Sequence, residues 1–193
     1  WDGDFFDWLI ENKSLLYNKD EYAMQYLVSR CVQIKADIIT QDPLEKLGLR
    51  SFLNLGHTFA HALEGITDYK VFSHGEAVGI GILLALQYSS NNLIDILGES
   101  YGELELECDK VEKIRQVLLG LYSQTKDFLE YFNCPVSIDL EVDVDSLLKY
   151  MSRDKKNTDH NIKLILLYKC GGCLLKSVLK DDLKGFLKQA CGP

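Results

Sequence analysis

The sequence lacks the features that mark two large classes of protein. Its longest apolar run, Ala77–Leu86, falls well short of the roughly 20 residues that a bilayer-spanning helix needs. It also has no surplus of positive charge, because its formal net charge is −8, whereas a general nucleic-acid binder needs a basic face for phosphate contacts. We therefore expect neither a membrane protein nor a nucleic-acid-binding protein.

Signs of a boundary between domains are also scarce. Only 3 prolines occur, and no Gly/Ser-rich linker, internal repeat or low-complexity segment interrupts the 193 residues. A chain of this length and ordinary composition can bury a sizeable core, so we expect residues 1–193 to form a single domain. Because the chain begins with Trp1 rather than Met, we also expect a fragment or a processed product.

The cysteines form neither a disulfide framework nor a zinc knuckle. All 6 are spread through the chain, a pattern typical of reduced thiols in a cytoplasmic protein. Cys170 and Cys173 have the spacing of a metal or redox pair, but no second such pair supplies the four ligands that a structural zinc needs. The intervening Gly171-Gly172 instead predicts a hairpin turn flanked by the two thiols.

Most of the chain has helical periodicity. Apolar residues recur with helical spacing over 5–16, and Asp20 predicts the N-cap of a long helix that ends before Pro43. Further helices are expected over 49–65, 75–91, 111–132, 143–151 and 181–190. The one strand signal is a pair of apolar runs over 163–178. The fold class predicted is therefore mainly α with one small β-hairpin, and no series of alternating strands and helices predicts a parallel sheet.

Polar side chains that could carry chemistry concentrate between Arg50 and Glu64, which we expect to lie on one helix. At 3.6 residues per turn, four of them share a sector of roughly 60°: Arg50, Asn54, His57 and His61. The other faces are apolar, so we expect a mostly buried helix whose polar stripe needs a polar partner. A hydrogen-bond network to neighbouring helices would satisfy the stripe, but two histidines at i and i+4 also commonly present imidazoles to a metal.

His74 is the third candidate for such a site. It begins a predicted helix after a short loop, and a turn back between two helices can bring it beside His57. His160, the last of the 4 histidines, lies in a polar loop and is expected to be an ordinary surface residue. Three lysines either complete an anion site or are solvated surface residues: Lys35, Lys155 and Lys156.

These blocks resemble the motifs of the 3-dehydroquinate synthase family. The family pattern has Ile-Lys-Ala-Asp, Gly-Leu-Arg, Asn-Leu-Gly-His-Thr-Phe-x-His-Ala and His-Gly-Glu-Ala-Val, then Asp-Lys-Lys before a hairpin. The same blocks occur here in the same order: Ile34–Asp37, Gly48–Arg50, Asn54–Ala62, His74–Val78 and Asp154–Lys156. The resemblance covers essentially the whole chain, with alanine at position 60 where the family has glycine and a loop over 42–48 that is one residue longer.

The resemblance implies a role for each candidate residue. His57 and His74 would be two of three protein ligands of a catalytic zinc or cobalt ion, the third being a glutamate upstream of this chain. His61 would contact the substrate near its phosphate, and one of Lys155 and Lys156 would contact the phosphate itself. Three residues would act with His61 in catalysis by holding the substrate carboxylate and hydroxyls: Lys35, Arg50 and Asn54.

The resemblance also implies a fold and a reaction. The chain would be the C-terminal helical domain of the dehydroquinate synthase and iron-dependent alcohol dehydrogenase type, with an NAD-binding domain upstream. The substrate would be 3-deoxy-D-arabino-heptulosonate 7-phosphate, a phosphorylated sugar acid. It would be converted to 3-dehydroquinate with loss of phosphate through transient oxidation by NAD, in the shikimate pathway of aromatic amino acid biosynthesis. The family is usually homodimeric. Because the isolated chain would lack the upstream domain and its glutamate ligand, we expect it to bind zinc poorly and to be inactive.

Three alternatives stay open. Sugar-phosphate cyclases of secondary metabolism share most of the motif and differ mainly around the substrate carboxylate. Iron-dependent alcohol and glycerol dehydrogenases also set histidines on helices, but they would not need Arg50, Asn54 or a Lys-Lys pair. A non-catalytic helical domain could have kept the motif, and it would bind no metal even in the presence of the upstream domain.

Overall fold

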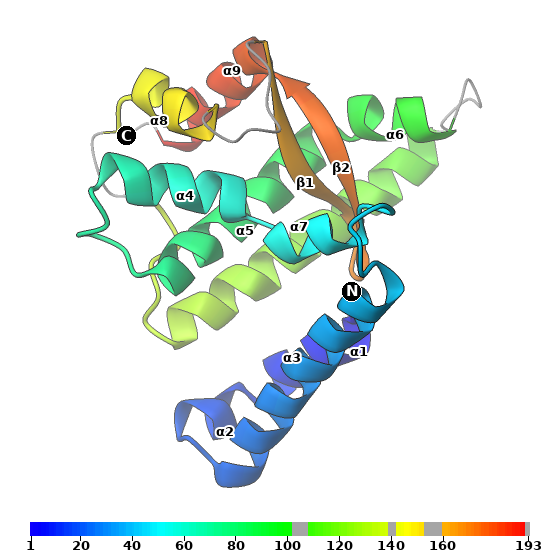
Figure 1. Cartoon of the computed structure of the whole chain (residues 1–193), viewed down its shortest axis with the longest axis vertical. Coiled ribbons are helices and arrows are strands. Elements are labelled where there is room, and N and C mark those ends of the chain that lie inside the picture. The colour runs from blue at the N-terminus through cyan, green and yellow to red at the C-terminus, as the bar shows by residue number, and fades with distance from the viewer. Residues whose placement is uncertain (102–107, 139–141, 153–159, 192–193) are drawn as a thin grey trace.

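The computed structural model of the chain describes residues 1–101, 108–138, 142–152 and 160–191. These residues form a helical body that carries one antiparallel hairpin, and a helical arm that projects from the body (Figure 1). The predicted mainly α fold with one hairpin is therefore confirmed. Among the described residues, no helix combines the length and the apolar character needed to cross a bilayer.

Three helices build the arm: α1 (Gly3–Glu11), α2 (Lys13–Tyr17) and α3 (Glu21–Gln41). The predicted N-cap of the long helix is confirmed, because the Asp20 carboxylate accepts a hydrogen bond from the backbone N–H of Ala23 at 3.0 Å. Stacked and edge-on contacts among Phe5, Trp8 and Tyr26 join α1 to α3. Aromatic packing between these two helices therefore holds the arm together.

Helix α5 (His74–Asn91) is the centre of the body (Figure 1). Its most extensive contacts are with three elements: α4 (His57–Ile66), α7 (Cys108–Tyr131) and strand β1 (Asn161–Lys169). A capping box begins the helix, since the Ser73 hydroxyl accepts from the backbone N–H of Glu76 while the Glu76 carboxylate accepts from the backbone N–H of Ser73. With neighbours on several sides, α5 is apolar around most of its circumference, as a buried helix must be.

The hairpin and two short helices close the core over α4 and α5. Strand β1 pairs antiparallel with β2 (Gly172–Leu179), with Ile165 opposite Leu175, and the positive φ of Gly171 (+68°) makes the predicted turn. Helices α8 (Val144–Met151) and α9 (Lys180–Ala190) pack against each other beside it. The larger core cluster draws on all of these elements, with members that include Phe59, Leu63, Ile80, Leu84, Leu147, Ile162, Leu164 and Leu187.

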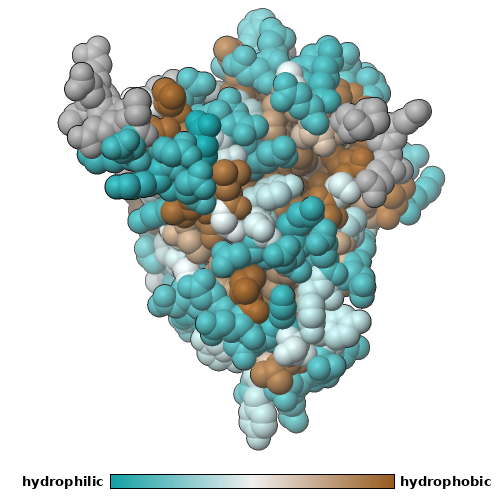
Figure 2. Space-filling view, turned by 180° about the vertical axis from the view of Figure 1, so that it is seen from behind, coloured by the Kyte–Doolittle hydropathy of each residue, from teal (hydrophilic) through white to brown (hydrophobic). Residues whose placement is uncertain are grey.

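Helix α6 (Leu93–Tyr101) was not predicted from the sequence. It follows α5 after a single capping residue, Asn92, and packs against α5 and α7. A second core cluster forms there, with members Leu86, Leu93, Leu97, Val111 and Leu118. On the face shown in Figure 2, apolar side chains reach the surface in patches among hydrophilic ones.

The prediction of one continuous helix over 49–65 is wrong. A 3-10 helix, η1 (Leu49–Asn54), ends with Leu55 as its C-cap, and Gly56 then adopts a left-handed conformation with φ +79° before α4 begins. The break lies where α5 crosses this segment, because a Cβ on Gly81 would stand 2.2 Å from the Gly56 carbonyl oxygen. The two backbones are therefore in direct contact, which explains the glycine inside α5, and the predicted polar stripe is divided between two elements.

Candidate metal centre

Three histidines from two helices converge at one edge of the body. His57 and His61 lie one turn apart on α4, and His74 begins α5 after the loop over 67–73. Their ring centroids are separated by 5.3 Å for His57 and His74, 5.6 Å for His57 and His61, and 6.1 Å for His61 and His74. The predicted approach of His74 to His57 is therefore confirmed, and the three imidazoles border one small volume.

A buried carboxylate belongs to the same cluster. Glu64 lies on the face of α4 that carries His57 and His61, its side chain is 6% exposed, and its Oε1 is 2.9 Å from Nδ1 of His74. A buried carboxylate needs such a partner. Glu64 was not among the site residues predicted from the sequence. Its spacing of three from His61 and seven from His57 places it on one helical face with them, which is the signal that could have found it.

Hydrogen bonds determine which ring nitrogen of two histidines carries a proton. Nδ1 of His57 is 3.2 Å from the carbonyl oxygen of Leu55, and Nδ1 of His74 faces the Glu64 carboxylate. Carbonyl and carboxylate oxygens can only accept, so both Nδ1 atoms donate, and in a neutral imidazole Nε2 keeps its lone pair. Metal-binding histidines usually have this arrangement, with the outer ring nitrogen donating to a carbonyl or carboxylate.

The cluster offers two different sets of metal ligands. Ligand atoms of His61, Glu64 and His74 all lie within 4.8 Å of one another. The alternative set is His57 and His74 through their Nε2 atoms, with Glu64 behind His74. His61 is exposed, and its ring nitrogens make no hydrogen bond to any residue that the structure describes. Either set contains the imidazole donors that zinc and cobalt bind.

The other predicted site residues lie on elements next to this cluster. Lys35 is exposed on α3, which packs against η1, the element that carries Arg50 and Asn54. Nε of Arg50 is 3.3 Å from Oε1 of Glu45, and Asn54 is exposed at the end of η1. Because of the break at Gly56, Arg50 and Asn54 do not extend the helical face of the histidines as predicted. Lys155 and Lys156 lie outside the described residues.

Asp42 organises the loop that leads to Arg50. Its side chain is buried, and its carboxylate accepts hydrogen bonds from the backbone N–H groups of Leu47 at 3.0 Å and Leu49 at 2.9 Å. These bonds, the one from Leu47 foremost, hold the pKa of Asp42 below its usual range. The charged carboxylate therefore fixes the loop and, through it, the start of η1.

Comparison with known sequences supports the motif resemblance. The 3-dehydroquinate synthase C-terminal family matches residues 1–99. The 3-dehydroquinate synthase of Shewanella loihica is 36% identical over 166 residues, which are 86% of this chain and 40% of that protein. That of Shewanella sp. (strain MR-4) is 38% identical over 167 residues with the same shares. That of Shewanella frigidimarina is 34% identical over 184 residues, 95% of this chain and 45% of that protein.

Solved structures share the fold. A crystal structure of 2-deoxy-scyllo-inosose synthase complexed with carbaglucose-6-phosphate, NAD+ and Co2+ has a TM-score of 0.60 and 21% identity, covering 88% of this chain and 42% of that one. Another 2-deoxy-scyllo-inosose synthase structure has a TM-score of 0.54 and 19% identity, covering 88% and 40%. The chain thus spans about two fifths of the length of the relatives it matches. The predicted class of helical domain is confirmed.

Proposed function

The chain belongs to the 3-dehydroquinate synthase family, and from this membership we propose that it is the metal- and substrate-binding helical domain of a 3-dehydroquinate synthase. The full-length enzyme would be a phosphorus–oxygen lyase of the shikimate pathway. It would convert 3-deoxy-D-arabino-heptulosonate 7-phosphate to 3-dehydroquinate with loss of phosphate. The observation that carries the proposal is the convergence of His57, His61 and His74, with the outer nitrogens of His57 and His74 already hydrogen-bonded.

His57 and His74 would hold a zinc or cobalt ion through their Nε2 atoms. Both Nδ1 atoms are engaged, by Leu55 and by Glu64, so both rings are oriented and aim their free nitrogens away from these partners. Glu64 would act behind His74 as the carboxylate of a carboxylate–histidine–metal arrangement. A third ligand would come from a part of the full-length protein outside this chain. When bound, the ion would act as a Lewis acid that polarises a substrate oxygen.

His61 and the start of α4 would receive the anionic part of the substrate. An N–H of the His61 ring can donate to a phosphate oxygen, since the ring nitrogens make no hydrogen bond within the described residues. Helix α4 begins after Gly56 without a side-chain cap, so its first N–H groups and its positive end also favour an anion. The two features would act together on a sugar phosphate.

Arg50, Asn54 and Lys35 would hold the substrate carboxylate and hydroxyls. Arg50 pairs with Glu45 near the surface, where ion pairs are weak, so a substrate carboxylate can replace that partner through bidentate hydrogen bonds. One of Lys155 and Lys156 would contact the phosphate. NAD would bind to another domain of the full-length protein. The 2-deoxy-scyllo-inosose synthase that shares the fold was crystallised with NAD+, Co2+ and a sugar-phosphate analogue, which supports this set of small molecules.

We also propose that the full-length enzyme is a cytoplasmic homodimer. The family resemblance supports the dimer. The cysteines whose side chains the structure describes support a reducing compartment, because none of these is paired: Cys31, Cys134, Cys170, Cys173 and Cys191.

Another sugar-phosphate cyclase is the second candidate, favoured by the likeness to 2-deoxy-scyllo-inosose synthase. Release of inorganic phosphate by the full-length protein, supplied with NAD and zinc or cobalt, separates the two. We expect release from 3-deoxy-D-arabino-heptulosonate 7-phosphate that a chelator abolishes. Release only from sedoheptulose 7-phosphate or glucose 6-phosphate would assign another cyclase. Metal binding without release would favour a dehydrogenase, and absence of both would favour a non-catalytic domain.

A further inference from the structure

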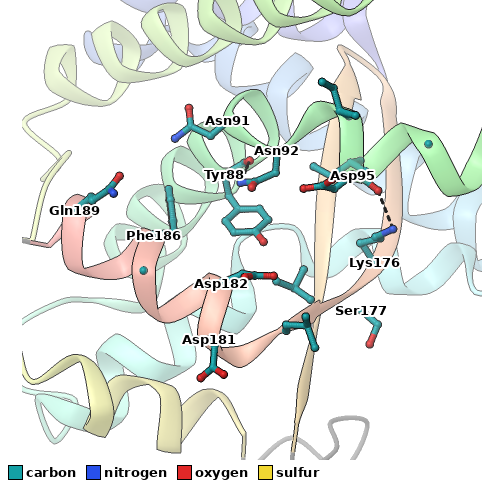
Figure 3. A pocket seen from close by; sticks show the side chains of 16 residues that line it. Tyr88, Asn91, Asn92, Asp95, Lys176, Ser177, Asp181, Asp182, Phe186 and Gln189 are labelled. Atoms are coloured by element: carbon teal, nitrogen blue, oxygen red, sulfur yellow. Dashed lines mark hydrogen bonds between the residues drawn. The ribbon is translucent and has the colours of Figure 1, made fainter. Parts of the chain in front are cut away.

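A second concave site lies at the opposite end of α5 from the histidines. It is a cavity of about 880 Å³, and its walls are the C-terminal end of α5, the first half of α6, the end of β2 and helix α9 (Figure 3). With a rise of about 1.5 Å per residue along α5, Asn91 in this cavity is roughly 25 Å from His74. The cavity is therefore separate from the candidate metal centre.

Tyr88 brings a hydroxyl to this cavity on an otherwise buried side chain. The residue is 5% exposed, and its ring packs edge-on against Phe186 with centroids 5.1 Å apart. Its hydroxyl points into the cavity (Figure 3) and makes no hydrogen bond to any residue in the described part of the chain. This hydroxyl, which faces the cavity on a rigidly packed ring, is therefore available to a ligand as a hydrogen-bond donor or acceptor.

The charges around the cavity favour a cation. The carboxylates of Asp95, Asp181 and Asp182 line it, and the C-terminal end of α5 adds partial negative charge. Asp181 and Asp182 also lie in the first turn of α9, where they balance the positive end of that helix. Lys176 is the cation on this wall, and its ammonium donates to the backbone carbonyl of Asp95 at 2.9 Å. Burial, with the charges of Asp182 and Asp95, raises the pKa of Tyr88 to about 12, so its hydroxyl keeps its proton.

We propose that this cavity binds an organic ammonium cation with an apolar body, of the arylalkylamine class. The ammonium would donate to the carboxylates of Asp95 and Asp182 and to the hydroxyl oxygen of Tyr88, three acceptors that lie on three different elements. The apolar body would pack on the rings of Tyr88 and Phe186. The proposal is independent of the function assigned to the histidines.

Three probes of similar shape and different charge test the proposal on the full-length protein. Isothermal titration calorimetry would compare 2-phenylethylamine, which is a cation, with neutral 2-phenylethanol and anionic 3-phenylpropionate. We expect the amine to bind about tenfold or more tightly than either of the others, because charge-assisted hydrogen bonds are the stronger ones. Equal binding of the three probes, or no binding of the amine, would overturn the proposal.

Variants then locate the binding site. Tyr88→Phe and Asp182→Asn should each weaken binding of the amine about tenfold, the effect of one lost charged hydrogen bond. Gly185→Leu should abolish binding while the fold is kept, because a Cβ on Gly185 meets nothing within 4 Å and the larger side chain would extend into open space. Asp127→Asn, which removes an equal charge from an exposed position on α7, should bind like the wild type. Amine binding that survives Gly185→Leu, or that falls equally in Asp127→Asn, would contradict the assignment.

Discussion

The two ends of helix α5 lie in different environments. At its start, His74 meets two histidines of α4 and a buried carboxylate, and the first half of the helix touches another backbone at Gly81. At its end, the Tyr88 hydroxyl opens on an acidic cavity where Gly185 has no neighbour within 4 Å of an added Cβ. The first end holds the rings of His57 and His74 in fixed orientations through hydrogen bonds, as the proposed metal centre requires, whereas the second leaves room for a whole molecule.

The largest expected effect is at the histidine end. His57→Ala and His74→Ala should each lower phosphate release by the full-length protein at least about 10³-fold, because each change removes a proposed ligand of the polarising ion. Metal content should fall with activity. His160→Ala, a change at an exposed histidine outside the cluster, should leave both unchanged. Loss of activity in His160→Ala as well would contradict a special role for the histidines of the cluster.

The tightness of packing should also differ between the two ends of α5, and its effect on stability should be smaller than the effect of the histidine substitutions on activity. Gly81→Ala should lower the free energy of unfolding by about 3 kcal/mol, the upper range for overpacking, because the new Cβ would meet the Gly56 carbonyl oxygen. Gly185→Ala should raise it by up to about 1 kcal/mol, since alanine is the better helix former and nothing obstructs it. Urea unfolding of both variants measures the contrast. Equal free energies of unfolding for the two variants would show that α5 and Gly56 are not in tight contact.

The role of Glu64 distinguishes the two ligand sets. Glu64→Gln keeps an oxygen that can accept from Nδ1 of His74, so metal affinity should fall less than about tenfold. Glu64→Ala removes that acceptor and should weaken affinity about 10- to 100-fold, as loss of an outer-shell partner does. Competition with a chromogenic chelator measures both. A Gln variant as defective as the Ala variant would mean that Glu64 binds the metal directly.

The smallest expected contrast between the two ends of α5 is in how their contributions to stability depend on pH. Hydrogen bonds from the side chain and backbone of Ser73 lower the pKa of Glu76, so this contribution to stability is present above the ordinary glutamate range and is lost as pH falls through the folded pKa. Ser73→Ala should therefore lower stability by about 1 kcal/mol at neutral pH and by less in acid. At the other end, the Asn92 amide donates to the Tyr88 carbonyl at 2.9 Å and does not titrate. The effect of Asn92→Ala should be the same at both pH values.

The histidine end could be predicted from the sequence because its parts are local. His57 and His61 are one helical turn apart, and His74 follows after one loop, so periodicity and a single turn place all three. The prediction of one polar stripe that includes Arg50 and Asn54 was wrong, because the helix is interrupted at Gly56. Its left-handed conformation is imposed by the crossing of α5, a contact between segments that helical spacing cannot reveal.

The cavity end could not be predicted from the sequence. Tyr88, Asp95, Lys176 and Asp182 come from four elements, α5, α6, β2 and α9, and no period or motif joins them. Helix α6 itself went unpredicted because one residue, Asn92, separates it from α5. The hairpin, in contrast, was predicted correctly, since Gly171-Gly172 between two apolar runs is a local signal.

Anomalous diffraction from crystals of the full-length protein loaded with cobalt tests the central claim most directly. The account predicts a metal peak bonded to Nε2 of His57 and Nε2 of His74, with Glu64 hydrogen-bonded behind His74 and not bonded to the ion. A peak bonded to His61 and Glu64, or no ordered metal beside α4 and α5, would contradict it.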